Sequence, residues 1–170
     1  MYTKHLLGMA GLALGIAVSV TVATADIRKV YPGAACQPFD DNANVRRTAE
    51  GIMQNNSNNT QDWICAVERN TIAANAVDGI VDAVIGVIDN NNSGADPKVT
   101  CTLYSRSKTT GLTDSEVQNS PAGASPNVRE LNYGSQVSAT GGYYYFHCKI
   151  PPVDGANKSG IAWYRIDEHQ

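Results

Sequence analysis

The sequence has little charge and no surplus of basic residues. Only 17% of its 170 residues are charged, and 13 Lys and Arg stand against 16 Asp and Glu, for a net charge of -3. Without a basic surplus the chain has little to neutralise a phosphate backbone, so we do not expect nucleic-acid binding as a main role. Hydrophobic residues make up 42% of the chain, which is enough for the core of one domain and excludes wholesale disorder.

Several catalytic motifs are also absent. The sequence contains no Gly-x-Ser-x-Gly nucleophile elbow, no phosphate-cradling glycine loop and no Cys-x-x-Cys pair, which argues against a serine hydrolase and a zinc site. His147 alternates outward in a predicted strand, which favours a surface position over a general base. Paired carboxylates, Asp40 with Asp41 or Asp82 with Asp89, could in principle act on a glycoside, but adjacent aspartates on a polar segment are usually solvated, which is the interpretation we favour. We therefore expect no enzyme activity and no cofactor.

The first residues have the pattern of a secretory signal peptide. Lys4 precedes an apolar run from Leu6 to Val22, and Ala23-Thr24-Ala25 closes it. This pattern predicts cleavage after Ala25. The alternative is a retained membrane anchor, because the run approaches the roughly 20 residues that span a bilayer, but its glycines weaken a helix. We expect a signal peptide at 1–25 and one secreted domain at 26–170, periplasmic or extracellular, with no stable membrane insertion after cleavage.

All four cysteines follow the predicted cleavage point: Cys36, Cys65, Cys101 and Cys148. An even number of cysteines in an oxidising compartment predicts disulfides. Three pairings are possible. We favour Cys36 with Cys65 and Cys101 with Cys148, because each pair joins neighbouring segments of a sheet protein, and we expect the two bonds to clamp two layers of strands together.

Alternating apolar and polar residues predict strands. The clearest are 99–104 and 143–150, where the cysteine falls on the apolar face. Further strands are expected at 81–88, 161–166 and, shorter, 63–67.

Two segments are less regular. Val45 to Asn55 fits a strand or turn better than a helix, because Gly51 and an Asn-rich run interrupt it. The polar region from Ser105 to Gly142 predicts long loops with one or two short strands, near Val128–Leu131 and Val137–Thr140. Together these patterns predict an all-β fold, an antiparallel β-sandwich with two disulfides and long polar loops.

A series of short motifs runs along most of the chain after residue 25. They are Tyr31-Pro32-Gly33, Cys36-Gln37-Pro38, Gly51-Ile52 with Asn55, Cys65-Ala66-Val67-Glu68-Arg69, Val87-Ile88-Asp89, Val99-Thr100-Cys101-Thr102-Leu103 and Tyr144-Tyr145-Phe146-His147-Cys148-Lys149-Ile150-Pro151. In this order they resemble a group of small exported bacterial proteins that carry no assigned activity. The resemblance implies a secreted two-disulfide β domain and nothing about its chemistry.

The segment from Asp89 to Asp96 has a calcium-loop pattern. Oxygen-bearing side chains stand at Asp89, Asn91 and Ser93, and Gly94 and Asp96 follow, as the six to eight oxygen ligands of a calcium ion require. The twelfth position, however, is Thr100 instead of a glutamate. A plain turn explains the same residues, so we favour the turn and keep calcium at Asp89, Asn91, Ser93 and Asp96 as a hypothesis.

Four aromatic residues form the second candidate site. Tyr143, Tyr145, Trp163 and Tyr164 lie in predicted strands and could line an exposed face that stacks on sugar rings, although tyrosine is also ordinary in strands.

We therefore predict an exported, non-catalytic β-sandwich that presents a binding or structural surface to a protein or glycan partner. The alternatives are a lectin-like carbohydrate-binding module, a small secreted hydrolase, and a self-assembling subunit in which edge strands join copies into a homo-oligomer.

Overall fold

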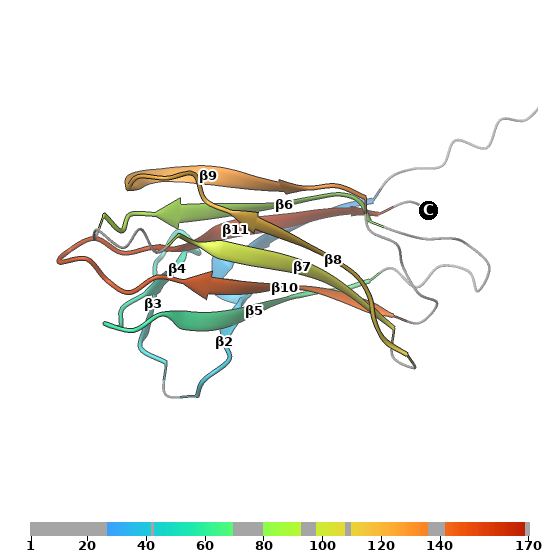
Figure 1. Ribbon diagram of the computed structural model, residues 1–170, viewed down its shortest axis with the longest axis horizontal. Helices are drawn as coiled ribbons and strands as arrows, with labels where there is room; N and C mark the ends of the chain where they lie inside the picture. Colours follow the sequence, from blue (N-terminus) through green and yellow to red (C-terminus); the bar gives the residue numbers. More distant parts are fainter. Residues whose placement is uncertain are drawn as a thin grey trace, which may run out of the picture.

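The computed structural model describes residues 27–41, 43–69, 80–92, 98–107, 110–135 and 142–168. Within these residues, eleven strands form two antiparallel sheets that pack face to face, and one short 3-10 helix lies between two of the strands (Figure 1). This confirms the predicted antiparallel β-sandwich. Within the same ranges, no helix has the length and apolar character needed to cross a membrane.

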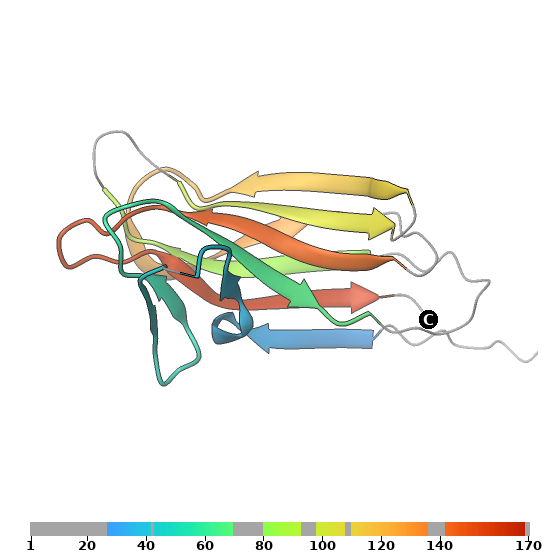
Figure 2. The ribbon, with the colours of Figure 1, turned by 90° about the horizontal axis from the view of Figure 1, so that it is seen from below.

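Sheet A contains six strands. Its order is β3 (Val45–Arg47), β4 (Met53–Asn55), β11 (Gly160–Glu168), β6 (Ile80–Asp89) and β9 (Ser125–Tyr133), and β1 (Ile27–Pro32) also pairs with β11. Figure 2 shows β1, in blue, beside β11, in red.

Sheet B contains five strands. Its order is β2 (Gln37–Pro38), β5 (Gln61–Val67), β10 (Tyr143–Ile150), β7 (Thr100–Ser107) and β8 (Gly111–Asn119). The 3-10 helix η1 (Gly33–Ala35) carries the chain from β1 in sheet A to β2 in sheet B. A Cβ at Gly33 would lie 1.9 Å from the carbonyl oxygen of Ile161 in β11, so only glycine allows this close crossing.

The strands expected from alternation are all present. Segments 63–67, 81–88, 143–150 and 161–166 lie in β5, β6, β10 and β11, and segment 99–104 lies in β7 except for Val99, which directly precedes it. The ambiguous segment from Val45 to Asn55 is the hairpin of β3 and β4, in which Gly51 has a φ of 80°. Strand or turn, and not helix, is therefore confirmed there.

The region after Ser105 contains more strand than expected. β8 was missed, and the short strand expected near Val128 is the nine-residue β9. Each of these strands ends its sheet and pairs with only one neighbour. Their outward side chains are exposed, so polar residues suit them and the sequence reads like a loop. The strand expected at 137–140 lies outside the described residues.

The inner faces of the two sheets form one core. In β7 and β10 buried and less buried residues alternate along the whole strand, as a sheet with one solvent-facing side requires. Large side chains fill the space between the layers, among them Trp63, Phe146 and Tyr164. Burial of this apolar area stabilises the sandwich and holds the outer face of each sheet at a fixed orientation.

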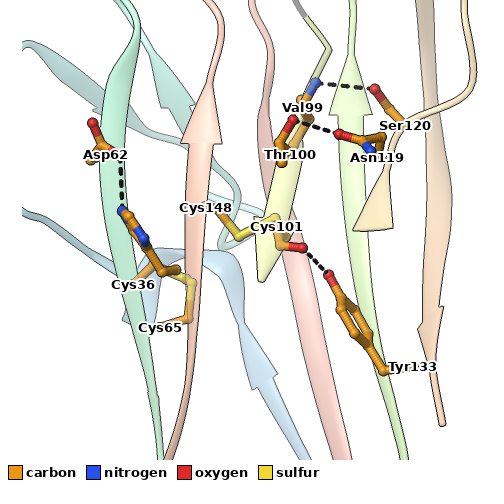
Figure 3. The surroundings of a disulfide bond; sticks show 11 residues. Cys36, Asp62, Cys65, Val99, Thr100, Cys101, Asn119, Ser120, Tyr133 and Cys148 are labelled. Carbon is orange, nitrogen blue, oxygen red and sulfur yellow. Dashed lines mark hydrogen bonds and ion pairs between the residues drawn. A yellow bond between two sulfur atoms is a disulfide. The ribbon is translucent and has the colours of Figure 1, made fainter. Parts of the chain in front are cut away.

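Both predicted disulfides are present, Cys36–Cys65 and Cys101–Cys148 (Figure 3). The expectation that they clamp the two layers is wrong. Cys101 and Cys148 are direct register partners on β7 and β10, so their bond lies within sheet B. Cys36 stands between η1 and β2, and its bond to Cys65 fixes the crossover to β5.

Tyrosine hydroxyls join the layers instead. Tyr133 in β9 donates a hydrogen bond to the carbonyl oxygen of Cys101 at 2.9 Å (Figure 3), and Tyr164 in β11 donates one to the carbonyl oxygen of Ala66 at 2.9 Å. Each bond runs from a strand of sheet A to a strand of sheet B. Burial raises the pKa of both hydroxyls, that of Tyr164 to about 12, which keeps them protonated donors over a wide pH range.

Candidate functional site

The outer face of sheet B carries a row of tyrosines. Tyr143 and Tyr145 alternate with the buried residues of β10, and both face away from the core. The register places Tyr104 of β7 directly beside Tyr145, and Arg106 beside Tyr143. We call Tyr104, Tyr143 and Tyr145 the tyrosine platform.

The three rings of the platform are stacked. The ring centroids of Tyr104 and Tyr145 are 5.1 Å apart with an angle of 25° between the planes, and those of Tyr143 and Tyr145 are 6.0 Å apart at 21°. Tyr143 is 48% exposed. A β-strand holds alternate side chains at a fixed spacing, so the near-parallel arrangement follows from strand geometry.

Arg106 packs against the platform. Its Nε donates a hydrogen bond to the hydroxyl of Tyr145 at 2.9 Å, and its Cζ lies 5.4 Å from the centre of the Tyr104 ring. A guanidinium over an aromatic face is attracted by the negative face of the ring. Arg106 therefore holds two of the three tyrosines in place and brings a positive charge to the surface.

A polar pair lies farther along the same face. His147 Nε2 is 2.8 Å from Asp62 Oδ1, and the two side chains are 28% and 41% exposed. Phe39, which is 77% exposed, is tied to the same strand through its backbone N–H, which donates to the Asp62 carbonyl oxygen. Hydrogen-bonding groups thus stand next to exposed aromatic rings.

Two adjoining hollows of about 350 and 420 Å³ cover this surface. They share Ile64, Arg106 and Tyr145. The first extends over Phe39, Asp62 and His147, and the second over Ala66 and Tyr143. The arrangement offers flat apolar rings to a ligand's apolar faces and hydrogen-bonding groups to its polar edges.

The structure divides the four predicted aromatic site residues. Tyr143 and Tyr145 belong to the platform, but Trp163 and Tyr164 lie in β11 of sheet A. Tyr164 is 1% exposed and stacks on Tyr31 in the core, with ring centroids 4.8 Å apart. The prediction of one shared face is wrong, because consecutive residues of a strand point to opposite sides and β11 belongs to the other layer.

Sequence reasoning missed Tyr104 and Arg106 as site residues. The alternation in 99–104 already placed Tyr104 on the outer side of its strand. The missing information was the pairing of β7 with β10, which brings Tyr104 next to Tyr145. Strand pairing over such a sequence distance depends on the whole fold.

The calcium hypothesis stays a prediction. Asp89 is 3% exposed, and its carboxylate accepts hydrogen bonds from the Ser120 hydroxyl and from the backbone N–H of Val99. The Asn91 amide donates to the Pro152 carbonyl oxygen at 2.8 Å. Ser93 and Asp96 lie outside the described residues. In the described ranges, no three His, Cys, Asp or Glu side chains cluster as metal ligands.

The candidate catalytic carboxylates lie in three different environments. Asp82 forms an ion pair with Arg165 on sheet A, whereas Asp89 is buried against Ser120. Asp40 and Asp41 are exposed beyond β2. Within the part of the chain that the structure describes, His147 has no Ser or Thr hydroxyl at hydrogen-bond distance.

Neither a protein-family model nor a curated protein matches this chain. Solved structures with distant similarity include the following two. One is a low-affinity xylan-binding module, CBM86, from the gut symbiont Roseburia intestinalis, with 10% identity over 84% of this chain and 96% of that chain and a TM-score of 0.48. The other is the CBM36-1 domain of a multidomain xylanase from the hindgut metagenome of Trinervitermes trinervoides, with 11% identity over 82% and 96% and a TM-score of 0.47. Similarity this low does not bear on what the present chain binds.

Proposed function

We propose that the chain is an exported, non-catalytic β-sandwich protein that binds carbohydrate on the outer face of sheet B. One observation carries the proposal: Tyr104, Tyr145 and Tyr143 form a near-parallel stack on an open sheet surface. Rigid aromatic rings offer contact area at a low cost in conformational entropy. An exposed aromatic surface of this kind marks an interaction site.

The groups around the rings favour a sugar as the ligand. A pyranose ring has apolar C–H faces and a rim of hydroxyls, so it needs a flat apolar surface with donors and acceptors beside it. The platform supplies the surface, and Asp62, His147 and Arg106 supply the polar groups. A few well-placed polar groups in an otherwise apolar site are typical of small-ligand recognition.

Binding of soluble polysaccharides, measured by affinity electrophoresis and on a glycan array, tests the proposal. Tyr145→Ala removes the central ring, and we expect it to weaken binding at least tenfold, about 1.4 kcal/mol. Val128→Ala is the matched control, because Val128 is 44% exposed on β9 of the opposite sheet. We expect that variant to bind like the wild-type protein. Folded wild-type protein that binds no glycan in either assay would disprove the function.

Export is a separate part of the proposal. Two intramolecular disulfides are typical of an oxidising compartment, and the Ala23-Thr24-Ala25 pattern predicts cleavage after Ala25. Intact mass of the protein recovered from the periplasm or medium should correspond to a chain that begins at Asp26 and contains no free thiol. A chain that keeps residues 1–25 would contradict cleavage while leaving glycan binding untouched.

A further inference from the structure

The guanidinium of Arg106 is only partly used by the protein. Nε donates to Tyr145, and one face of the group lies over Tyr104. The terminal nitrogens, Nη1 and Nη2, donate no hydrogen bond to another described residue. Across the described ranges, no Asp or Glu forms an ion pair with Arg106.

Two arginines on the outer face of sheet A, Arg28 and Arg165, differ from Arg106 in this respect. Arg28 is paired with Asp167 through two hydrogen bonds of 3.1 Å, and Arg165 is paired with Asp82 and lies 3.5 Å from Asp167. These arginines have an internal carboxylate, which satisfies the fork-shaped guanidinium. Arg106 has the same guanidinium group, is held by Tyr145 and Tyr104 instead, and lines both hollows of the tyrosine face.

The positions of the other charged residues on this face also matter for the ligand. Asp62, an acidic residue of this face, is hydrogen-bonded to His147 and is the register partner of Lys149. Lys149 lies six residues along β10 from Tyr143, the register partner of Arg106, which corresponds to about 20 Å along the strand. Arg106 brings a positive charge to the tyrosine end of the surface, where Glu68 stands just beyond β5, although the whole chain has a net charge of -3.

We infer that the tyrosine platform takes glycans that carry carboxylate groups, such as polymers with uronic acid residues, and that the terminal nitrogens of Arg106 bind the carboxylate. This inference rests on the proposed glycan binding and specifies its ligand class. Stacking on Tyr145 and Tyr143 would place a sugar ring beside Arg106, within reach of a carboxylate on that ring. The negative net charge makes non-specific attraction of a polyanion an inadequate explanation for such binding.

The test compares acidic polysaccharides with their own neutral forms. Polygalacturonate, alginate and hyaluronate are each measured beside the carboxyl-reduced polymer by calorimetry, at one fixed salt concentration. Each pair has the same linkages and differs in the carboxylate, so a difference in affinity reports charge recognition. We expect at least one acidic polymer to bind about tenfold more tightly than its reduced form.

Two variants separate the charge of Arg106 from its structural role. Arg106→Gln removes the charge and also disturbs the hydrogen bond to Tyr145. Tyr145→Phe removes the same hydrogen bond but keeps both the ring and the charge. We expect Arg106→Gln to bind the acidic polymer no more tightly than its reduced form, whatever its overall affinity, and Tyr145→Phe to keep the preference. Circular dichroism checks that both variants are folded.

The outcomes are distinct. Equal binding of acidic and reduced polymers in every pair, or a preference that survives Arg106→Gln, would overturn the inference and leave glycan binding intact. Loss of the preference in Tyr145→Phe as well as in Arg106→Gln would also overturn it, because the arginine would then act only by positioning the ring. Absence of binding to any polysaccharide would overturn the proposed function together with the inference.

Discussion

The two sheets of the sandwich treat their outer faces differently. On the outer face of sheet A, the side chains pack against one another and are largely buried. The indole of Trp163 lies over Gly86, and the aliphatic residues Val84 and Ile88 are 3% and 7% exposed. A chain of ion pairs connects Arg28, Asp167, Arg165 and Asp82. On sheet B the tyrosines stack with each other and remain accessible from solvent.

The covalent bonds are distributed in the opposite way. All four cysteines of the chain are used to brace sheet B, by tying β7 to β10 and the η1 crossover to β5. An outer face whose side chains bury apolar area against one another gains stability from that burial. A face that stays open gives up this gain, and cross-links supply rigidity without using ligand-binding surface. This difference fits the proposal that sheet B carries the binding surface.

The largest expected effect on stability comes from removing the Cys101–Cys148 disulfide of sheet B. Cys101→Ala/Cys148→Ala should lower the free energy of unfolding by about 4 kcal/mol, because the bond closes a loop between residues 47 positions apart. Urea unfolding measures the loss. The Cys36–Cys65 bond closes a shorter loop, between residues 29 positions apart, so the matched double variant Cys36→Ala/Cys65→Ala should lose slightly less stability. Little change in either variant would contradict the idea that sheet B needs its cross-links.

A larger residue at Gly86, beneath the indole of Trp163, tests how much the packing of the outer face of sheet A contributes to stability. A Cβ at Gly86 would lie 2.6 Å from Cε2 and Nε1 of Trp163 and 3.0 Å from Cγ1 of Val128, so Gly86→Ala must displace the indole. We expect a loss of up to about 3 kcal/mol in thermal unfolding and a shift in tryptophan fluorescence.

Glycan affinity separates the two faces in that experiment. Gly86→Ala should keep it, because the substitution lies on the layer opposite the platform. Tyr145→Ala should show the reverse, with a smaller loss of stability, from its two ring contacts and one hydrogen bond, and binding weakened at least tenfold. Loss of glycan binding in folded Gly86→Ala protein would mean that the two faces are not independent.

Alkaline pH tests the tyrosine bonds between the sheets. The pKa of Tyr164 is raised from 10.0 to about 12 by burial, so the unfolded chain loses this proton first as pH rises. The stabilising contribution is therefore complete below pH 10 and decreases through pH 12, by about 2 kcal/mol at pH 12. Tyr133, whose pKa is also raised by burial, acts in the same direction. Tyr164→Phe should make the stability curve flatter over this range, and an unchanged slope would contradict the assignment.

Removal of the Tyr133 hydroxyl should have the smallest effect. Tyr133→Phe deletes the hydrogen bond to the Cys101 carbonyl oxygen while keeping the ring that packs edge-on against Phe146. We expect a loss of about 1 kcal/mol in urea unfolding, typical of one buried hydrogen bond. Glycan affinity should not change, because the hydroxyl lies inside the sandwich. A weaker ligand affinity would show that inter-sheet bonds also shape the outer face.

Local patterns in the sequence were sufficient for the central strands. β7 and β10 alternate strictly, with Cys101 and Cys148 on the apolar side, so their existence, their inward faces and their disulfide could all be predicted. The edge strand β8 could not, and β9 was predicted only as a short strand near Val128–Leu131, because solvent tolerates polar side chains there and the alternation is weak. The same reasoning applied to Trp163 and Tyr164 failed, since these neighbours point to opposite faces of β11.

The sequence by itself determined which residues of each strand face inward and which cysteines form bonds, because a strand repeats every two residues and a disulfide needs only two inward cysteines on adjoining segments. Only the tertiary structure decided which strands are neighbours. Pairing of β7 with β10 places Tyr104 and Arg106 beside Tyr145, and the packing of two layers puts Trp163 on the opposite surface. Register between distant strands depends on the packing of the whole core, and no local stretch of sequence contains that information.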